Sequence, residues 1–227
     1  MKRCLTIFAP FVVVASLAPF GTQAQPSVAP FPSRLHAAAA RGDLNAVLEA
    51  LGSGENVDRR DNHGRTALLL AVEGGHTGIA RALMERGGSV NAQASNQDTP
   101  WLLAGALGRT DILDLMLARE PDLSIRNRFG GNALIPACEQ GHVDTVRLLT
   151  TKSRIDVNHI NNLGWTCLLE IVILGDGGRR HQDATRLVMA AGADPNISDK
   201  EGVTPLAHAR RRGQLGIAML IETAGGR

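Results

Sequence analysis

The pentapeptide Gly64-Arg65-Thr66-Ala67-Leu68 decides the fold, because related pentapeptides follow it along the chain at nearly constant intervals. They begin at Gln97, Gly130, Gly164 and Gly202, at spacings of 33, 33, 34 and 38 residues. Counting back 33 residues from Thr66 leads to Ser33, which precedes Arg34-Leu35-His36. A period of this length is typical of a stacked array, since one such unit cannot bury its own apolar face.

Each unit repeats the same order of helix signals. A threonine or its substitute can cap a first short helix, and proline lies just inside that helix at Pro100 and Pro205. A second helix with paired apolar residues follows, and a short extended stretch then leads through a polar tip to the next unit. Glycines are expected to end the first helices, at Gly42, Gly75, Gly108, Gly141 and Gly213.

These segments resemble ankyrin repeats, and the resemblance covers residues from Ser33 to about Ala224. The matching pieces are Gly-Val-Thr-Pro-Leu at 202–206, Gly-His at 75–76 and 141–142, and Gly-Ala-Asp-Pro-Asn at 192–196. The family's motif histidine is present only as His36, and Trp101 stands where leucine is usual, so we expect Trp101 in the core. The resemblance implies an all-α solenoid of about six stacked helix-turn-helix repeats with β-hairpin tips over 33–224, followed by a tail at 225–227.

The N-terminal segment has the layout of a secretory signal peptide. Lys2 and Arg3 precede an apolar run over 5–18, and Thr22-Gln23-Ala24 offers small residues for cleavage after Ala24. We therefore predict a signal peptide at 1–24, a Pro-rich linker at 25–32, and a periplasmic or secreted protein. The alternative is a retained anchor, but the run is interrupted by Pro10 and is shorter than the ~20 residues of a spanning helix.

Charge and cysteine content narrow the possible partners. Cleavage would remove Lys2 and Arg3 from 24 basic residues and leave 22 against 22 acidic ones, so the mature chain gives no argument for binding nucleic acid or an anionic membrane. The remaining cysteines, Cys138 and Cys167, occupy different positions within their repeats. We expect them to be buried hydrophobes too far apart for a bridge.

The candidate binding surface consists of the tips and the first-helix faces, which line a concave groove in ankyrin-like stacks. Arginines gather in the tips, and Phe129, Ile160, Leu163 and Trp165 place large apolar groups where solvent should reach. Arginine and tryptophan are frequent anchors of binding hot spots. The candidate partner-binding residues are Arg60, Arg65, Arg126, Arg128, Phe129, Leu163, Trp165, Arg179 and Arg180.

The interval of 38 residues indicates an insertion within 175–181, between the two helices of the fifth unit. Such an insertion is expected to bulge outward as a loop. Its glycines with Arg179, Arg180 and His181 could bind an anion, and Asp176, His181 and Asp183 could bind a metal. A solvated surface loop and a protein-contact loop are the other interpretations.

The sequence contains no Gly-x-Ser-x-Gly, His-Glu-x-x-His or paired-cysteine metal motif, and we predict no catalytic residue and no cofactor. We expect a monomer that binds another protein in the cell envelope without catalysis. The resemblance allows a role in supporting or inhibiting an envelope enzyme without selecting it. The alternatives are a small-ligand, anion, metal or enzymatic site at 175–181, and a structural part of an envelope assembly.

Overall fold

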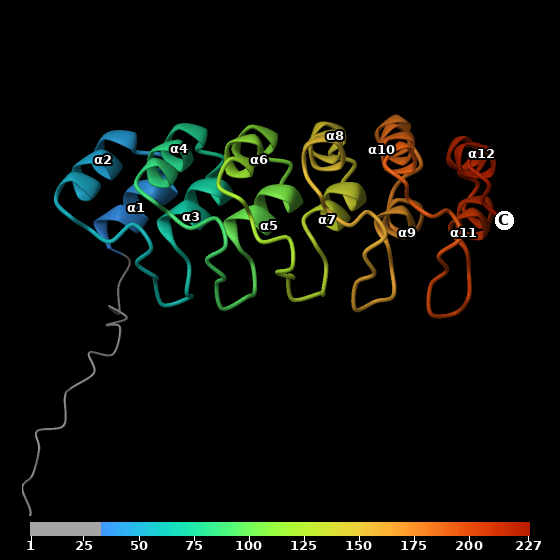
Figure 1. Ribbon diagram of the computed structural model, residues 1–227, viewed down its shortest axis with the longest axis horizontal. Helices are drawn as coiled ribbons and strands as arrows, with labels where there is room; N and C mark the ends of the chain where they lie inside the picture. The colour runs from blue at the N-terminus through green and yellow to red at the C-terminus, as the bar shows by residue number, and fades with distance from the viewer. Residues whose placement is uncertain (1–32) are drawn as a thin grey trace, which may run out of the picture.

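The computed structural model describes residues 33–227, so the predicted signal segment and linker, 1–24 and 25–32, lie outside the described residues. The described chain forms six helix pairs stacked side by side in one row (Figure 1). The first helices of the pairs form one layer: α1 (Arg34–Arg41), α3 (Ala67–Gly74), α5 (Pro100–Ala106), α7 (Leu134–Glu139), α9 (Cys167–Ile173) and α11 (Pro205–Arg211). The second helices form the other: α2 (Leu44–Gly52), α4 (Thr77–Glu85), α6 (Thr110–Leu117), α8 (Val143–Lys152), α10 (Arg179–Ala190) and α12 (Leu215–Thr223). The tip loops that precede α3, α5, α7, α9 and α11 project from the first layer (Figure 1).

The predicted helix boundaries are confirmed by side-chain caps. The hydroxyl oxygen of Thr99 accepts a hydrogen bond from the backbone N–H of Leu102 at 3.1 Å, and the other threonines at this position cap α3, α9 and α11 in the same way. The fourth repeat has Asn132 instead, and its Oδ1 accepts from the backbone N–H of Leu134 and Ile135. The glycine that follows α1, Gly42, has a φ of 78°, a left-handed conformation that suits glycine.

One continuous hydrophobic core runs between the two layers and through all six repeats. Trp101 is only 2% exposed, as predicted, and it occupies the same repeat position as the buried leucines Leu68, Leu134 and Leu168. Because every first helix contributes a large side chain at this position, each repeat completes the core of its neighbour. The stack therefore depends on contacts between repeats rather than on a core within each one.

Side chains at the turn between the two helices tie each repeat to the one before it. Arg109 donates to the carbonyl oxygen of Glu73 at 3.0 Å, and Gln214 donates to that of Gly175 at 3.1 Å. These bonds satisfy carbonyl groups at or just beyond the C-termini of first helices, which have no partner within the helix. His142 occupies the same turn position and lies over Gly108 of the preceding repeat, so its role is structural, as the sequence predicted.

The two cysteines correct one expectation, because Cys138 and Cys167 form a disulfide with Cα atoms 5.6 Å apart. Their different repeat positions do not separate them, since neighbouring first helices pack with an offset of about one turn. Gly105 and Ala133, at the same two repeat positions one repeat earlier, also lie in close contact. The stack thus brings Cys138 of α7 against the first residue of α9.

The inserted segment also differs from the expected outward loop. Only residues 174–178 connect α9 to α10, and Arg179, Arg180 and His181 belong to the first turn of α10. Asp176 accepts from the backbone N–H of Gly178 at 2.8 Å and pairs with the ring of His181 at 2.6 Å. The extra residues are therefore shared between this five-residue connection and a longer second helix, which has 12 residues.

The tips are hairpin-shaped loops without assigned strands among residues 33–227. In the first tip, the backbone N–H of Asp61 donates to the carbonyl oxygen of Arg65 at 2.9 Å, which closes the loop without extending into a ladder. The predicted all-α fold is confirmed, and the predicted β-hairpins are reduced to closed turns. No helix within 33–227 has the length and apolar composition needed to cross a bilayer.

Candidate functional site

Four of the five tips are held by an Asp or Asn side chain five residues before the helix cap, and the second tip has Ala94 there instead. Oδ1 of Asn127 accepts from the backbone N–H of Phe129 and Gly131, at 3.0 and 2.9 Å. Oδ1 of Asn161 accepts in the same way from Leu163 and Trp165, at 3.0 Å each. Asn and Asp favour such turns because their short side chains can replace backbone hydrogen-bond partners. The tip conformation is therefore encoded locally, within five residues.

Adjacent tips are also bonded to each other. The backbone N–H of Asn162 donates to the carbonyl oxygen of Phe129 at 2.9 Å, and that of Ser95 donates to His63 at 2.9 Å. The ammonium group of Lys200 donates to the carbonyl oxygen of Asn162 at 2.6 Å. These bonds align the tips into one row (Figure 1) and limit their independent motion.

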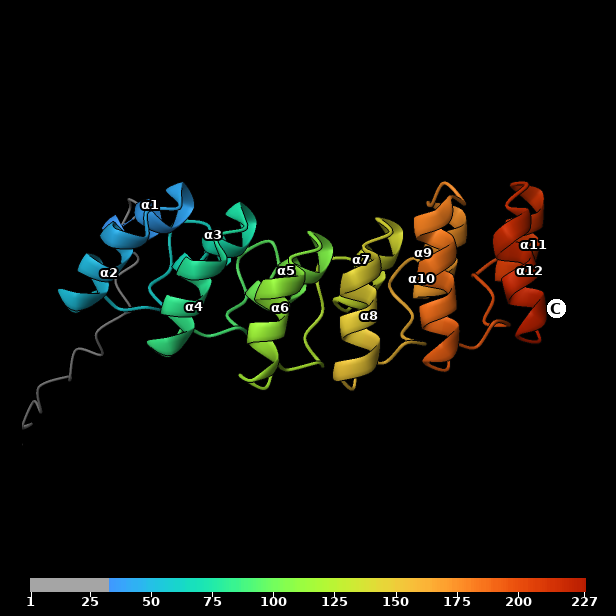
Figure 2. The same cartoon turned by 90° about the horizontal axis from the view of Figure 1, so that it is seen from above.

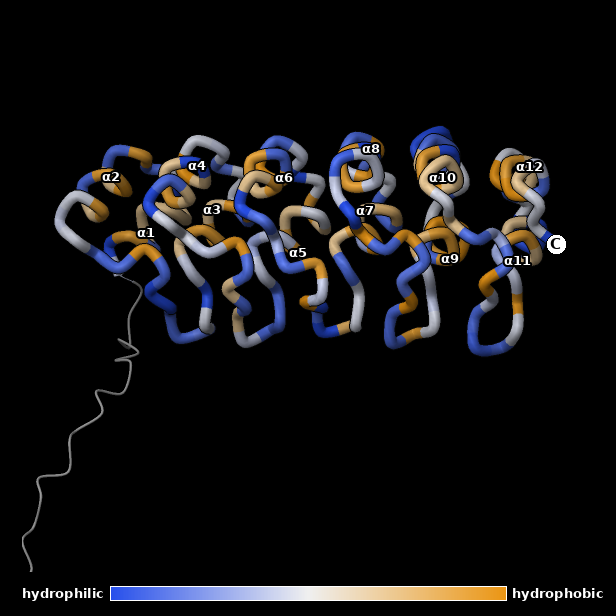
Figure 3. The backbone as a smooth tube through the Cα atoms, viewed as in Figure 1, coloured by the Kyte–Doolittle hydropathy of each residue, from blue (hydrophilic) through white to orange (hydrophobic). Residues whose placement is uncertain are grey.

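Three large apolar side chains on two of these tips are half exposed. Phe129, Ile160 and Leu163 are 51%, 49% and 49% exposed, and we call them the apolar tip patch. Hydrophobic segments are visible in the tip loop that leads to α9 (Figure 3). Polar residues flank these side chains in sequence, Asn127 and Arg128 before Phe129 and Asn161 and Asn162 before Leu163. Exposed apolar groups with polar neighbours are the usual anatomy of a protein interface.

Trp165, a predicted anchor, lies in a different environment. It is only partly exposed and packs against the hydrophobic core beneath the tip. Its backbone N–H is one of the two groups that Asn161 holds. The indole therefore supports the tip from below, while Phe129 and Leu163 offer their side chains to solvent.

The predicted arginines fall into two groups. Arg60 donates to the carbonyl oxygens of Gly64 and Gln93, Arg65 pairs with Asp61 at 2.8 Å, and Arg126 donates to Leu123 and Ile125. These three guanidinium groups bind the protein's own tips. Arg128 instead remains about half exposed, 3.6 Å from Asp98 and with its guanidinium carbon 4.6 Å from the centre of the Phe129 ring.

Arg179 and Arg180 are exposed, but the structure does not bring them to the tips. They lie at the turn after α9, whereas the tip lies before α9, so the length of that helix separates them. Asp183 pairs with Arg186 at 2.6 Å, and both ring nitrogens of His181 contact protein groups, Asp176 and the carbonyl oxygen of Glu139. No cluster of metal-binding side chains occurs among residues 33–227.

Glu170 was not among the sequence candidates. It is only 4% exposed, and its Oε1 accepts from Nδ2 of Asn161 at 2.8 Å, while Oε2 has no partner. Burial, together with repulsion from Glu139, raises the pKa of Glu170 to about 7. One feature of the sequence could have identified Glu170. It is a carboxylate at the repeat position where the second repeat has Leu70. Asn161 therefore links the titration of Glu170 to the tip that carries Leu163.

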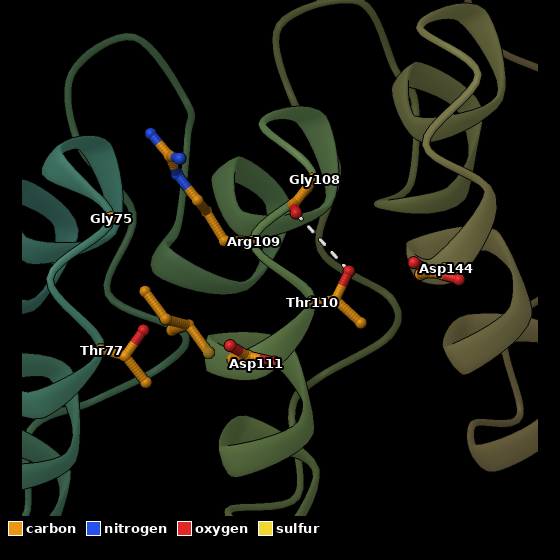
Figure 4. A pocket seen from close by; sticks show the side chains of 8 residues that line it. Gly75, Thr77, Gly108, Arg109, Thr110, Asp111 and Asp144 are labelled. Carbon is orange, nitrogen blue, oxygen red and sulfur yellow. Dashed lines mark hydrogen bonds between the residues drawn. The ribbon is translucent and has the colours of Figure 1, made fainter.

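A hollow of about 380 Å³ lies at the turns around the N-termini of α4 and α6 (Figure 4). Glycine, threonine and charged side chains line it, and Thr110 within it bonds Thr145 at 2.7 Å. Asp111 and Asp144 are exposed and Arg109 is partly exposed, so no buried charge is aimed at a ligand. This hollow lacks the apolar walls and convergent polar groups of a small-molecule site.

The architecture defines the class as an α-solenoid of helix pairs with projecting tips. A family model described as ankyrin repeats (3 copies) matches residues 35–127 and 101–199, and the chain belongs to the ankyrin repeat family. Ankyrin repeats are generally non-catalytic modules for protein–protein interaction.

Bacterial proteins are among the similar ones. The chain is 37% identical over 199 residues to the putative ankyrin repeat protein YahD of Escherichia coli K12, covering 88% of this chain and 99% of YahD. A solved ankyrin repeat domain from Acinetobacter baumannii AYE has a TM-score of 0.81 at 47% identity, covering 85% of this chain and 98% of that one. The solved ankyrin repeat protein EF0377 has a TM-score of 0.80 at 42% identity, covering 83% and 96%.

Proposed function

We propose that this chain is a non-catalytic module of the bacterial cell envelope that binds a partner protein through the apolar tip patch. The observation that carries the proposal is the exposure of Phe129, Ile160 and Leu163 on two tips that are joined by the bond from the backbone N–H of Asn162 to the carbonyl oxygen of Phe129. A surface held in place before binding loses little conformational entropy on docking. Arg128, beside Phe129, supplies a positive charge that would select acidic groups at the edge of the patch.

The envelope location is supported by two features of the chain. The N-terminal residues have the layout of an export signal, and the disulfide between Cys138 and Cys167 is a bond that persists in oxidising compartments such as the bacterial periplasm. A role at the segment 175–181 is less well supported, because His181 and Asp183 are already engaged by neighbouring groups of the protein.

The binding surface is tested by capture of a partner from an envelope extract with immobilised chains. We expect Phe129→Ser combined with Leu163→Ser to lose a protein that the unaltered chain retains. The matched control is Leu44→Ser combined with Leu48→Ser, because these α2 leucines are 40% and 44% exposed but lie outside the tips. Retention by the tip variant, or equal loss with the control, would contradict the assignment.

The location is tested by fractionation of cells that express the full chain, followed by thiol alkylation under denaturing conditions. We expect the chain in the periplasmic or secreted fraction, with Cys138 and Cys167 alkylated only after reduction. A cytoplasmic chain whose two cysteines react without reduction would contradict the proposed compartment.

A further inference from the structure

Glu170 of α9 is a buried carboxyl group with one oxygen unpaired. Its position, four residues after the helix cap, is occupied by Leu70, Leu103 and Pro136 in the three preceding repeats. The side chain is only 4% exposed, and its Oε2 has no hydrogen-bond partner. Burial in this form is tolerable for a neutral carboxyl group and costly for a charged one.

The other oxygen of Glu170 is bonded to the side chain that closes the tip. Nδ2 of Asn161 donates to Oε1 of Glu170 at 2.8 Å. Oδ1 of the same amide accepts from the backbone N–H of Leu163 and Trp165, at 3.0 Å each. The carboxyl group therefore fixes the orientation of the amide that holds Leu163, a member of the apolar tip patch.

Neighbouring repeats provide an internal comparison for this bond. In the last repeat the two equivalent positions are also bonded, since Asp199 pairs with Nε2 of His208 at 2.6 Å. In the fourth repeat Asn127 closes the tip in the same way as Asn161, but Pro136 stands at the position of Glu170 and has no side chain that could bond it. The fourth-repeat tip thus has the same closure without a titratable group behind it.

The helix on one side of Glu170 opposes its ionisation. In the row, α9 lies between α7 and α11 (Figure 2), and it also packs against α10. From α7, Glu139 acts on Glu170 as a like charge. Burial and this repulsion together raise the pKa of Glu170 to about 7.

The other surrounding groups do not supply a compensating cation. His181 of α10 and His208 of α11 each pair with an aspartate, and His159 of the tip contacts the carbonyl oxygen of Gly130 at 2.6 Å. The remaining charged side chains of α10 and α11 are exposed or partly exposed, and they are Arg179, Arg180, Asp183, Arg186, Arg210 and Arg211. Within residues 33–227, an ionised Glu170 therefore keeps only the bond from Asn161.

We propose that Glu170 is a proton-dependent switch for the tip at 161–165: the neutral carboxyl group holds Asn161 and keeps the tip closed, whereas the ionised group turns toward water and releases it. The proton passes to solvent. A released tip no longer fixes Leu163 relative to the neighbouring tip, so binding at the apolar tip patch weakens as the pH rises. This regulation rests on the proposed function of the patch.

The switch is tested without a partner by NMR hydrogen exchange of backbone amides in the unaltered chain. After correction for the intrinsic exchange rate, opening at Leu163 and Trp165 should increase about thirtyfold between about pH 5.5 and about pH 8. This increase follows by linkage from a pKa of about 7 in the closed tip and 4.5 in the open one. The amides of Phe129 and Gly131, in the fourth-repeat tip, should change much less. Equal opening at both pH values, or an equal increase in both tips, would overturn the switch.

Two variants identify the titrating group. Glu170→Gln keeps an acceptor for Asn161 and removes the charge, so its tip should stay closed at both pH values. Glu139→Gln removes the like charge, which lowers the pKa of Glu170 and should reduce the increase in opening. Glu139 is partly exposed, so this second variant should fold even if the buried substitution does not. An increase that the folded variants leave undiminished would overturn the proposal.

The effect on binding is tested with the protein captured from the envelope extract. The unaltered chain should retain that protein at about pH 6 and lose most of it at about pH 8, whereas Glu170→Gln should retain it at both. Equal retention by the unaltered chain at the two pH values would overturn the regulation. Capture of no protein at either pH would contradict the proposed function instead, and amide exchange would still decide whether the proton controls the tip.

Discussion

Cys138 of α7 and Cys167 of α9, 29 positions apart in sequence, form a disulfide that joins the fourth repeat to the fifth. Both side chains are fully buried between neighbouring first helices. The bond joins α7 and α9, the two helices that follow the tips carrying Phe129 and Leu163. Because Cys167 is the first residue of α9, the crosslink also anchors the segment to which the tip at 161–165 is attached.

Loss of this bond should weaken the whole stack. Closing a loop of this length lowers the entropy of the unfolded chain, and the combined change Cys138→Ala and Cys167→Ala should cost about 3–4 kcal/mol in the free energy of unfolding. Urea denaturation with and without a reductant measures the effect. The reductant should shift the unaltered chain toward the variant and leave the variant unchanged, and an equal shift of both chains would contradict the prediction.

Because neighbouring first helices approach each other closely, replacing two glycines with alanine should change the free energy of unfolding by unequal amounts. A Cβ at Gly105 would overlap the carbonyl oxygen of Ala133, whereas a Cβ at Gly78 meets nothing within 4 Å. Gly105→Ala should lower the free energy of unfolding by about 1–3 kcal/mol, and Gly78→Ala should leave it unchanged or raise it by up to about 1 kcal/mol. Thermal denaturation checks both, and similar effects at the two sites would contradict the packing.

Glu170 predicts a pH dependence of stability. Its pKa is raised in the folded chain from 4.5 to about 7, so between these values the folded chain binds the extra proton. Stability from this group is therefore present below pH 4.5 and is lost as the pH rises through about 7. Urea denaturation across this range should show a loss on the order of 1–3 kcal/mol relative to Glu170→Gln, which keeps the bond from Asn161.

His142 has the opposite effect on the pH dependence of stability, so its contribution must be measured separately from that of Glu170. Burial and the nearby Arg180 and Arg109 lower the pKa of His142 from 6.5 in the folded chain. Stability is then lost as the pH falls below 6.5, because the unfolded chain binds the extra proton. The variant His142→Gln, which introduces the residue present at Gln214, should remove this slope while leaving that of Glu170. If Glu170→Gln and the unaltered chain show the same pH profile, the buried carboxyl group does not titrate as described.

Truncation of the Trp101 side chain should cause a large loss of stability. It is 2% exposed and replaces the leucine of the other repeats, so Trp101→Ala should cost about 3–5 kcal/mol, whereas Trp101→Leu should cost less. Chemical denaturation measures both variants. A small effect of the alanine variant would show that the core can collapse around the missing ring.

Much of the fold could be predicted from the residues themselves. Thr99 with Pro100 marks a helix start, Gly42 marks a helix end, and the regular spacing indicates stacking, because each of these signals acts within one repeat. The apolar tip residues Phe129 and Leu163 were recognised because they depart from the polar composition of the other tips. Glu170 was overlooked because its role depends on burial, which a single position in a sequence does not reveal.

The sequence by itself determined the repeat period, the helix caps, the buried face of each helix and the apolar residues of two tips, because all of these follow from local conformational preference and hydrophobic periodicity. Only the tertiary structure decided the disulfide between Cys138 and Cys167, the supporting place of Trp165, and the bond from Arg60 to the carbonyl oxygen of Gln93. These features depend on the offset between neighbouring helices and on which groups meet across repeats. Such contacts join residues about 30 positions apart, and no pattern within one repeat encodes them.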